Sequence, residues 1–229
     1  KFDEQLVDAL NLMANSLKSG LNLPQVIQNG SGWYRSLGTE KSAGVKIFSL
    51  SGQVNKPGNY ELPLGTTFRE LIYEHGGGIC EDHTIKAIMP AGASSSLIVA
   101  TEQALDTPMD YESVPAVGAQ LGSASMIVVD DTVNIAWLLN KTLHFFKHES
   151  CGKCTPCREG TYWMMHITDR LVSGKASSED VVLLQSVASQ IKGKCFCALG
   201  EFSIEAVLTG IERFEEDFKA VTGGEKVAV

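Results

Sequence analysis

Cysteine spacing limits what this chain can fold into more than any other feature of the sequence. Three cysteines, each separated from the next by two residues, are Cys151, Cys154 and Cys157, and two more, Cys195 and Cys197, follow in a separate segment. A tight C-x2-C-x2-C triplet completed by one remote cysteine is the arrangement that holds an iron–sulfur cluster. Structural zinc usually takes its ligands as two pairs, and the triplet has no second pair of that spacing. The spacing therefore favours a four-iron cluster over zinc, disulfides or free thiols.

Spacing alone leaves the fourth ligand open. Cys195 and Cys197 are two residues apart, so in an extended loop their side chains would point the same way. Either cysteine could therefore complete the set of four thiolates.

Other residues near the triplet are candidates for positioning and tuning it. Gly152 lets the backbone wrap closely and direct its N–H groups towards sulfur. Lys153 and Arg158 would add positive potential, although each is equally consistent with a solvated surface charge. His148 lies three residues before the triplet and is a further candidate neighbour; it shares a helix face with His144, but the pair has no third ligand nearby. No nucleophile–base pair or carboxylate pair indicates a catalytic residue.

Composition excludes several classes of function. The chain has 19 basic against 27 acidic side chains, a formal charge of −8, which disfavours binding to nucleic acid or to an anionic membrane. Five of the six cysteines fall in two short segments of a 229-residue chain, which indicates metal binding in a reducing compartment rather than a secreted disulfide framework. No stretch has the roughly 20 apolar residues of a membrane span, and Asp3 and Glu4 stand where a signal peptide is basic. We therefore expect no direct membrane insertion.

The sequence predicts an α+β chain in four parts. Helical periodicity covers residues 5–20, a turn is expected at residues 55–58, and Thr67 is placed to cap a helix. The four expected strands are residues 45–50, 59–62, 86–89 and 126–129. The parts are an N-terminal helical segment and linker (1–44), a small α+β domain (45–131), a four-helix domain (132–221) and a tail (222–229).

The second domain is expected to be all helix. Thr132 is a candidate cap for its first helix, Ser177 and Asp180 form a capping-box pattern at the start of its third, and its fourth is expected over residues 202–218. Helices joined by such short links predict a bundle. Because both cysteine segments fall between helices, we expect the metal site at one end of the bundle.

From Asn22 to Phe218 the sequence closely resembles the C-terminal half of the flavoprotein (51 kDa, or F) subunit of respiratory complex I. The NAD-linked hydrogenase and formate dehydrogenase diaphorase subunits share this layout. The resemblance is carried by residues 36–42, 48–60, 63–66, 121–123, 127–130, 149–160 and 197–200. It implies a β-grasp (ubiquitin-like, soluble-ligand-binding) domain followed by a four-helix iron–sulfur domain.

The resemblance also implies a ligand set. Cys151, Cys154, Cys157 and Cys197 would hold one [4Fe–4S] cluster, with Cys197 chosen because it opens the run Cys-Ala-Leu-Gly. Cys195 would then be a nearby thiol, able to act as a substitute ligand.

The implied function is electron transfer in an NADH dehydrogenase (NADH:quinone oxidoreductase), with electrons accepted singly from FMN. The family's flavin and NADH half is missing from this sequence, so we expect no FMN- or NAD(H)-binding residue here and no NADH oxidation by this chain alone. The implied partners are the [2Fe–2S] 24 kDa-type subunit and the large iron–sulfur subunit, in a complex peripheral to the inner membrane on its cytoplasmic side. The alternatives are a diaphorase subunit of an NAD-linked hydrogenase or formate dehydrogenase, and a non-catalytic cluster- or zinc-binding interaction module.

Overall fold

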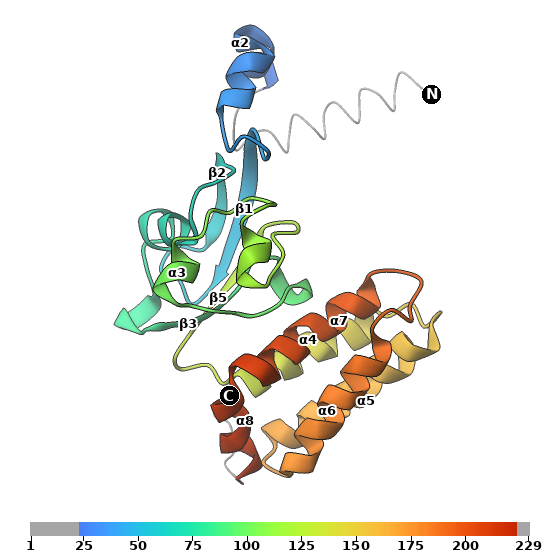
Figure 1. Ribbon diagram of the computed structural model, residues 1–229. Coiled ribbons are helices and arrows are strands. Elements are labelled where there is room, and N and C mark those ends of the chain that lie inside the picture. Colours follow the sequence, from blue (N-terminus) through green and yellow to red (C-terminus); the bar gives the residue numbers. More distant parts are fainter. Residues whose placement is uncertain (1–22, 224–229) are drawn as a thin grey trace.

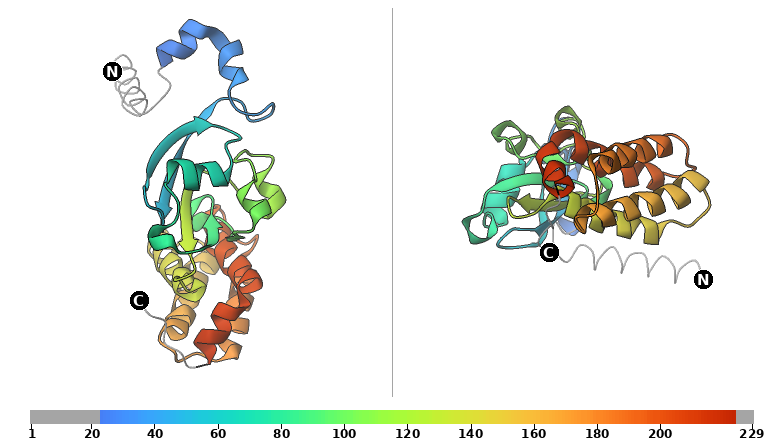
Figure 2. Two further views of the ribbon diagram at one scale, coloured as in Figure 1. Left: turned by 90° about the vertical axis from the view of Figure 1, so that its left-hand side faces the viewer. Right: turned by 90° about the horizontal axis from the view of Figure 1, so that it is seen from below.

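The computed structural model describes residues 23–223, a mixed β-sheet with short helices around it followed by a group of packed helices (Figure 1). The helix expected over residues 5–20 lies outside the described residues, as does most of the expected tail. The first described element is α2 (Leu23–Ser36), which is interrupted at Gly30, where φ is 83°. Figure 2 shows α2 at one end of the molecule and the packed helices at the other, with the sheet between them.

The sheet has five strands in the order β2-β1-β5-β3-β4. β1 pairs antiparallel with β2 and parallel with β5, and β3 pairs antiparallel with both β5 and β4. All four expected strands are confirmed, and the fifth, β4, was missed because it is only two residues long. The bounds are β1 Val45–Gly52, β2 Gly58–Pro63, β3 Ile85–Met89, β4 Ile98–Val99 and β5 Ser125–Asp130.

Both faces of the central strands are buried, and they contribute to different hydrophobic cores. Met126 and Val128 on β5 belong to a core with the π-helical segment Glu70–His75 on one face of the sheet. Val129, the alternate residue, joins Met89 of β3 in a second core with the packed helices. This alternation follows from the two-residue period of side chains along a strand, so one sheet separates two cores.

Five helices follow the sheet: α4 (Ile135–Glu149), α5 (Thr155–Val172), α6 (Ser178–Ile191), α7 (Leu199–Arg213) and α8 (Glu215–Thr222). The single helix expected over residues 202–218 is therefore wrong, because Phe214 (φ −129°, ψ 44°) breaks it between α7 and α8. The expected capping box of Ser177 and Asp180 is confirmed at the start of α6. Among residues 23–223, none of these helices combines the length and apolarity needed to cross a bilayer.

The start of α4 also differs from expectation. Asn134, not Thr132, caps this helix, and its side chain accepts a hydrogen bond of 2.8 Å from the backbone N–H of Ala136. Thr132 is engaged elsewhere, since its hydroxyl donates to Asp130 at the end of β5 over 2.6 Å. Both residue types cap helices well, so the contact with the strand end decides between them.

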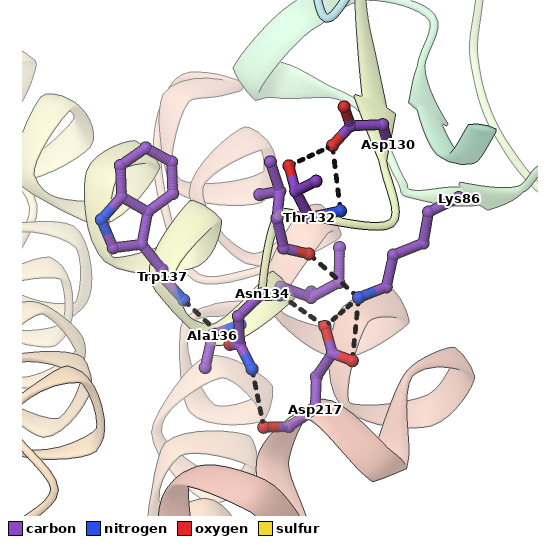
Figure 3. Close-up of polar contacts among 9 residues, drawn as sticks. Lys86, Asp130, Thr132, Asn134, Ala136, Trp137 and Asp217 are labelled. Atoms are coloured by element: carbon purple, nitrogen blue, oxygen red, sulfur yellow. Dashed lines mark hydrogen bonds and ion pairs between the residues drawn. The ribbon is translucent and has the colours of Figure 1, made fainter. Parts of the chain in front are cut away.

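A polar cluster joins the sheet to the first and last of these helices (Figure 3). The ammonium of Lys86 on β3 donates to both carboxylate oxygens of Asp217 on α8, at 2.9 and 2.6 Å, and to the carbonyl of Val133. The Asp217 carboxylate also accepts from the backbone N–H of Ile135 at 2.6 Å, and Asn134 donates to the Asp217 carbonyl. The side chains of Lys86 and Asp217 are only 22% and 15% exposed, so this ion pair is largely shielded from water.

Candidate metal centre

Both cysteine segments lie in loops at the same end of the packed helices (Figure 1). The first loop connects α4 to α5 and carries Cys151 and Cys154; the second connects α6 to α7 and carries Cys195 and Cys197. Cys154 is the N-cap residue of α5, and Cys157 lies in the first turn of that helix. The helix therefore starts inside the triplet, and its first amides have no partner within the helix itself.

One hydrogen bond to sulfur joins the two loops, and a second contact with sulfur links the first loop to the start of α5. The backbone N–H of Phe196, in the second loop, donates to the Cys154 sulfur at 3.3 Å. The Ser150 hydroxyl lies 3.3 Å from the sulfur of Cys157, which is buried. Cys151 is exposed. Ser150 was not among the predicted site residues, although its place at the C-cap of α4, directly before the triplet, is a usable signal.

The two cysteines of the second loop have different surroundings. Cys195 is half-buried, and the next residue, Phe196, is the one whose backbone N–H donates to the Cys154 sulfur. Burial raises the pKa of the Cys195 thiol, and the neighbouring sulfurs of Cys157 and Cys154 raise it further. The Cys195 sulfur packs on Gly200, where an added Cβ would lie only 2.6 Å from it. Cys197, in contrast, is exposed.

The other predicted site residues, Gly152, Lys153, Arg158 and His148, differ in how closely they contact the triplet loop. Gly152 adopts a left-handed conformation (φ 76°), and its carbonyl accepts a hydrogen bond of 2.6 Å from the Arg158 guanidinium. This bond ties Arg158 to the triplet loop, while Lys153 is exposed. His148 is 85% exposed and pairs with its neighbour Glu149 at 2.9 Å. A hollow of about 470 Å³ lies beside Cys151, lined by Lys147, His148, Ser150, Gly152, Arg158, Glu159 and Tyr162.

His144 and His148 do not form a metal pair. The His144 ring lies 2.8 Å from Asp169 on α5, and Asp169 also approaches His166 at 3.4 Å. Among residues 23–223, no three His, Cys, Asp or Glu side chains converge in a way that would hold a single metal ion.

The chemistry of the donors suits an iron–sulfur cluster, because cysteine thiolates are the ligands that hold such clusters. Hydrogen bonds to sulfur, such as the one from the Phe196 N–H to Cys154, tune a cluster's potential.

Two family models match the chain. Residues 137–221 match the NADH-ubiquinone oxidoreductase-F iron-sulfur binding region, which includes both cysteine loops. Residues 47–86 match the SLBB domain, which covers most of β1, all of β2 and the start of β3.

Curated relatives and solved structures point the same way. In Mycobacterium tuberculosis, the F-type subunit of NADH-quinone oxidoreductase is 43% identical over 211 residues, covering 92% of this chain and 47% of the relative. Its Escherichia coli counterpart is 37% identical over 207 residues, covering 90% and 46%. A crystal structure of an air-oxidized NAD+-reducing [NiFe]-hydrogenase superposes with a TM-score of 0.76 at 29% identity, covering 86% of this chain and 33% of that one.

The chain thus spans about half the length of the curated relatives it matches. These likenesses identify the chain as a relative of the C-terminal half of the 51 kDa flavoprotein family, to which the F-type subunits of NADH-quinone oxidoreductase belong.

Proposed function

We propose that this chain carries single electrons through one [4Fe–4S] cluster, as the cluster-bearing half of an NADH dehydrogenase flavoprotein subunit. One observation carries the proposal: the Phe196 N–H bonds the Cys154 sulfur, so the remote cysteine loop meets the triplet. The iron–sulfur binding region matched by residues 137–221 supports the same conclusion.

Four thiolates are proposed as the cluster ligands: Cys151, Cys154, Cys157 and Cys197. When bound, the cluster supplies one-electron redox chemistry between FMN and the next acceptor. The amides at the start of α5 present positive potential to it, which stabilises thiolate and added electron charge. Arg158, whose guanidinium donates to the Gly152 carbonyl and also pairs with Glu159, is a cation beside the triplet loop.

The finer fold assignment is also a proposal. We assign residues 45–131 to a β-grasp domain and residues 132–221 to the cluster-binding helical domain. The strand order β2-β1-β5-β3-β4, with a helical segment packed on one face of the sheet, supports the first assignment. The proximity of both cysteine loops at one end of the helices supports the second.

The complete subunit is proposed to bind FMN and NAD(H) in the half that this chain does not match. The chain would then pass electrons within a larger assembly peripheral to the inner membrane on its cytoplasmic side. The 24 kDa-type [2Fe–2S] subunit and the large iron–sulfur subunit are its proposed partners there. A diaphorase subunit of an NAD-linked hydrogenase is the second candidate, favoured by the likeness to the NAD+-reducing [NiFe]-hydrogenase structure.

Anaerobic reconstitution with iron and sulfide tests this proposal. We expect about four iron and four sulfide per chain, a broad visible absorption band, and no reduction of a dye by NADH with FMN added. Cys80→Ala is the matched control, because Cys80 lies outside both loops and its loss should leave the iron content unchanged. Zinc binding without iron, or NADH oxidation by the pure chain, would contradict the proposal.

A further inference from the structure

The cluster site has one more cysteine than a four-iron cluster requires. Cys195 is the less exposed of the two remote cysteines: it is half-buried and its sulfur packs against Gly200. The residue that follows it, Phe196, donates its backbone N–H to the Cys154 sulfur at 3.3 Å, which brings Cys195 next to the triplet.

Cys197 has an equal claim from the chain geometry. Phe196 separates the two cysteines, and its amide is fixed to the Cys154 sulfur at 3.3 Å. Consecutive Cα atoms are about 3.8 Å apart, so Cys195 and Cys197 flank the same anchored point. Each of the two cysteines is therefore a direct neighbour of the residue that contacts the triplet, so either could supply the fourth sulfur.

We propose that Cys195 and Cys197 are exchangeable fourth ligands, so that the cluster has two linkage forms; this rests on the proposed function. In the exchange, the iron–sulfur bond to Cys197 breaks and one to Cys195 forms. The thiol proton of Cys195 passes to the released Cys197 sulfur. No electron moves and no co-reactant is needed.

The two forms differ in a measurable way. The Cys195 thiolate would be half-buried against Gly200, whereas the Cys197 thiolate is exposed to water. Solvent exposure and hydrogen bonds to sulfur set the electronic properties of a cluster. The reduced parent protein should therefore give two overlapping EPR signals, one from each form.

Alanine replacement separates the forms. We expect Cys195→Ala and Cys197→Ala each to keep the parent's iron content and to show one of its two EPR components. The double variant should lose one iron per chain and give a three-iron signal when oxidised. If Cys197→Ala alone gives the three-iron signal while Cys195→Ala keeps the parent spectrum, Cys197 is the sole fourth ligand and the proposal fails. If instead Cys195→Ala alone gives the three-iron signal, Cys195 is the sole fourth ligand and the proposal also fails.

Alkylation of the unaltered, cluster-loaded chain gives a second readout that needs no variant. In the form ligated by Cys195, the exposed Cys197 thiol is free to react with iodoacetamide, so mass spectrometry should find a labelled fraction of Cys197 with the iron retained. Complete protection of Cys197 would overturn the exchange. A parent chain and a Cys80→Ala control that both bind no cluster would instead refute the proposed function, and this inference with it.

Discussion

Replacing Asp217 with alanine should destabilise the protein by about 3 kcal/mol. An exposed ion pair contributes about 0.2–1 kcal/mol, but removing one partner of a buried pair costs about 3–5 kcal/mol, because the other charge is left unpaired. The side chains of Lys86 and Asp217 are 22% and 15% exposed, which puts this pair nearer the buried limit. The replacement also removes the acceptor for the Ile135 amide at the start of α4, worth about 1 kcal/mol.

Urea and thermal unfolding followed by circular dichroism measure this effect. For a chain of this size, about 3 kcal/mol should lower Tm by about 6–12 °C. A double-mutant cycle with Lys86→Met isolates the pair. The double variant should cost at least about 1 kcal/mol less than the sum of the single variants, because it leaves no unpaired charge.

A control on the same helix makes the comparison strict. Lys219 also pairs with carboxylates, Glu215 and Glu216, but all three side chains are more than half exposed. Lys219→Met should therefore leave the unfolding midpoint unchanged. If Asp217→Ala unfolds at the parent midpoint, or the cycle with Lys86→Met is additive, the shielded ion pair does not join the sheet to α8 as the structure indicates.

Three further predictions concern packing, pH and metal. Gly160→Ala should lower the free energy of unfolding in urea by about 1–3 kcal/mol, because its new Cβ would lie 2.6 Å from the buried Ile191 side chain. An unchanged urea midpoint would contradict this close approach of α5 and α6. The Arg170 guanidinium holds the pKa of Asp180 below its usual value, so this carboxylate stabilises the fold above its unfolded pKa, about 3.9, and the contribution is lost as pH falls through the lower folded pKa. Asp180→Asn should therefore weaken the fall in stability below about pH 4. The same dependence of stability on pH in parent and variant would count against the pair. Iron chelation should raise hydrogen exchange in the two cysteine loops more than in β1, because metal-binding energy is folding energy where loops meet at a metal; equal loosening would refute it.

The parts of the fold that local chemistry determines were predictable from the sequence. The capping box of Ser177 and Asp180 needs only residues three apart, and the four longer strands show runs of β-prone residues. The break at Phe214 was not predictable, because the apolar spacing continues through Phe214 to Phe218, and both side chains are buried. The cap of α4 was missed although the contact is local: the Thr132 hydroxyl donates to Asp130, only two residues earlier, and Asn134 caps the helix instead.

At the site, spacing predicted that a remote loop would meet the triplet, and the bond from Phe196 to Cys154 is the contact that brings them together. The difference between Cys195 and Cys197 could not be predicted from the residues themselves, because their spacing gives them the same direction. It depends on the packing of Cys195 against Gly200, which is a tertiary feature. The ligand set itself stays a prediction.

The sheet that separates two cores limits how this architecture can be recombined. Met89 and Val129 are at most 1% exposed, and they are covered by the helices that hold the cysteine loops. If the helices were transplanted alone into another protein, their apolar side would no longer pack against the sheet, and the remaining sheet would expose an apolar face to water. Gene fusions that move the cysteine loops should therefore succeed only when they include β3 and β5, so the sheet and the helices should be inherited as one unit.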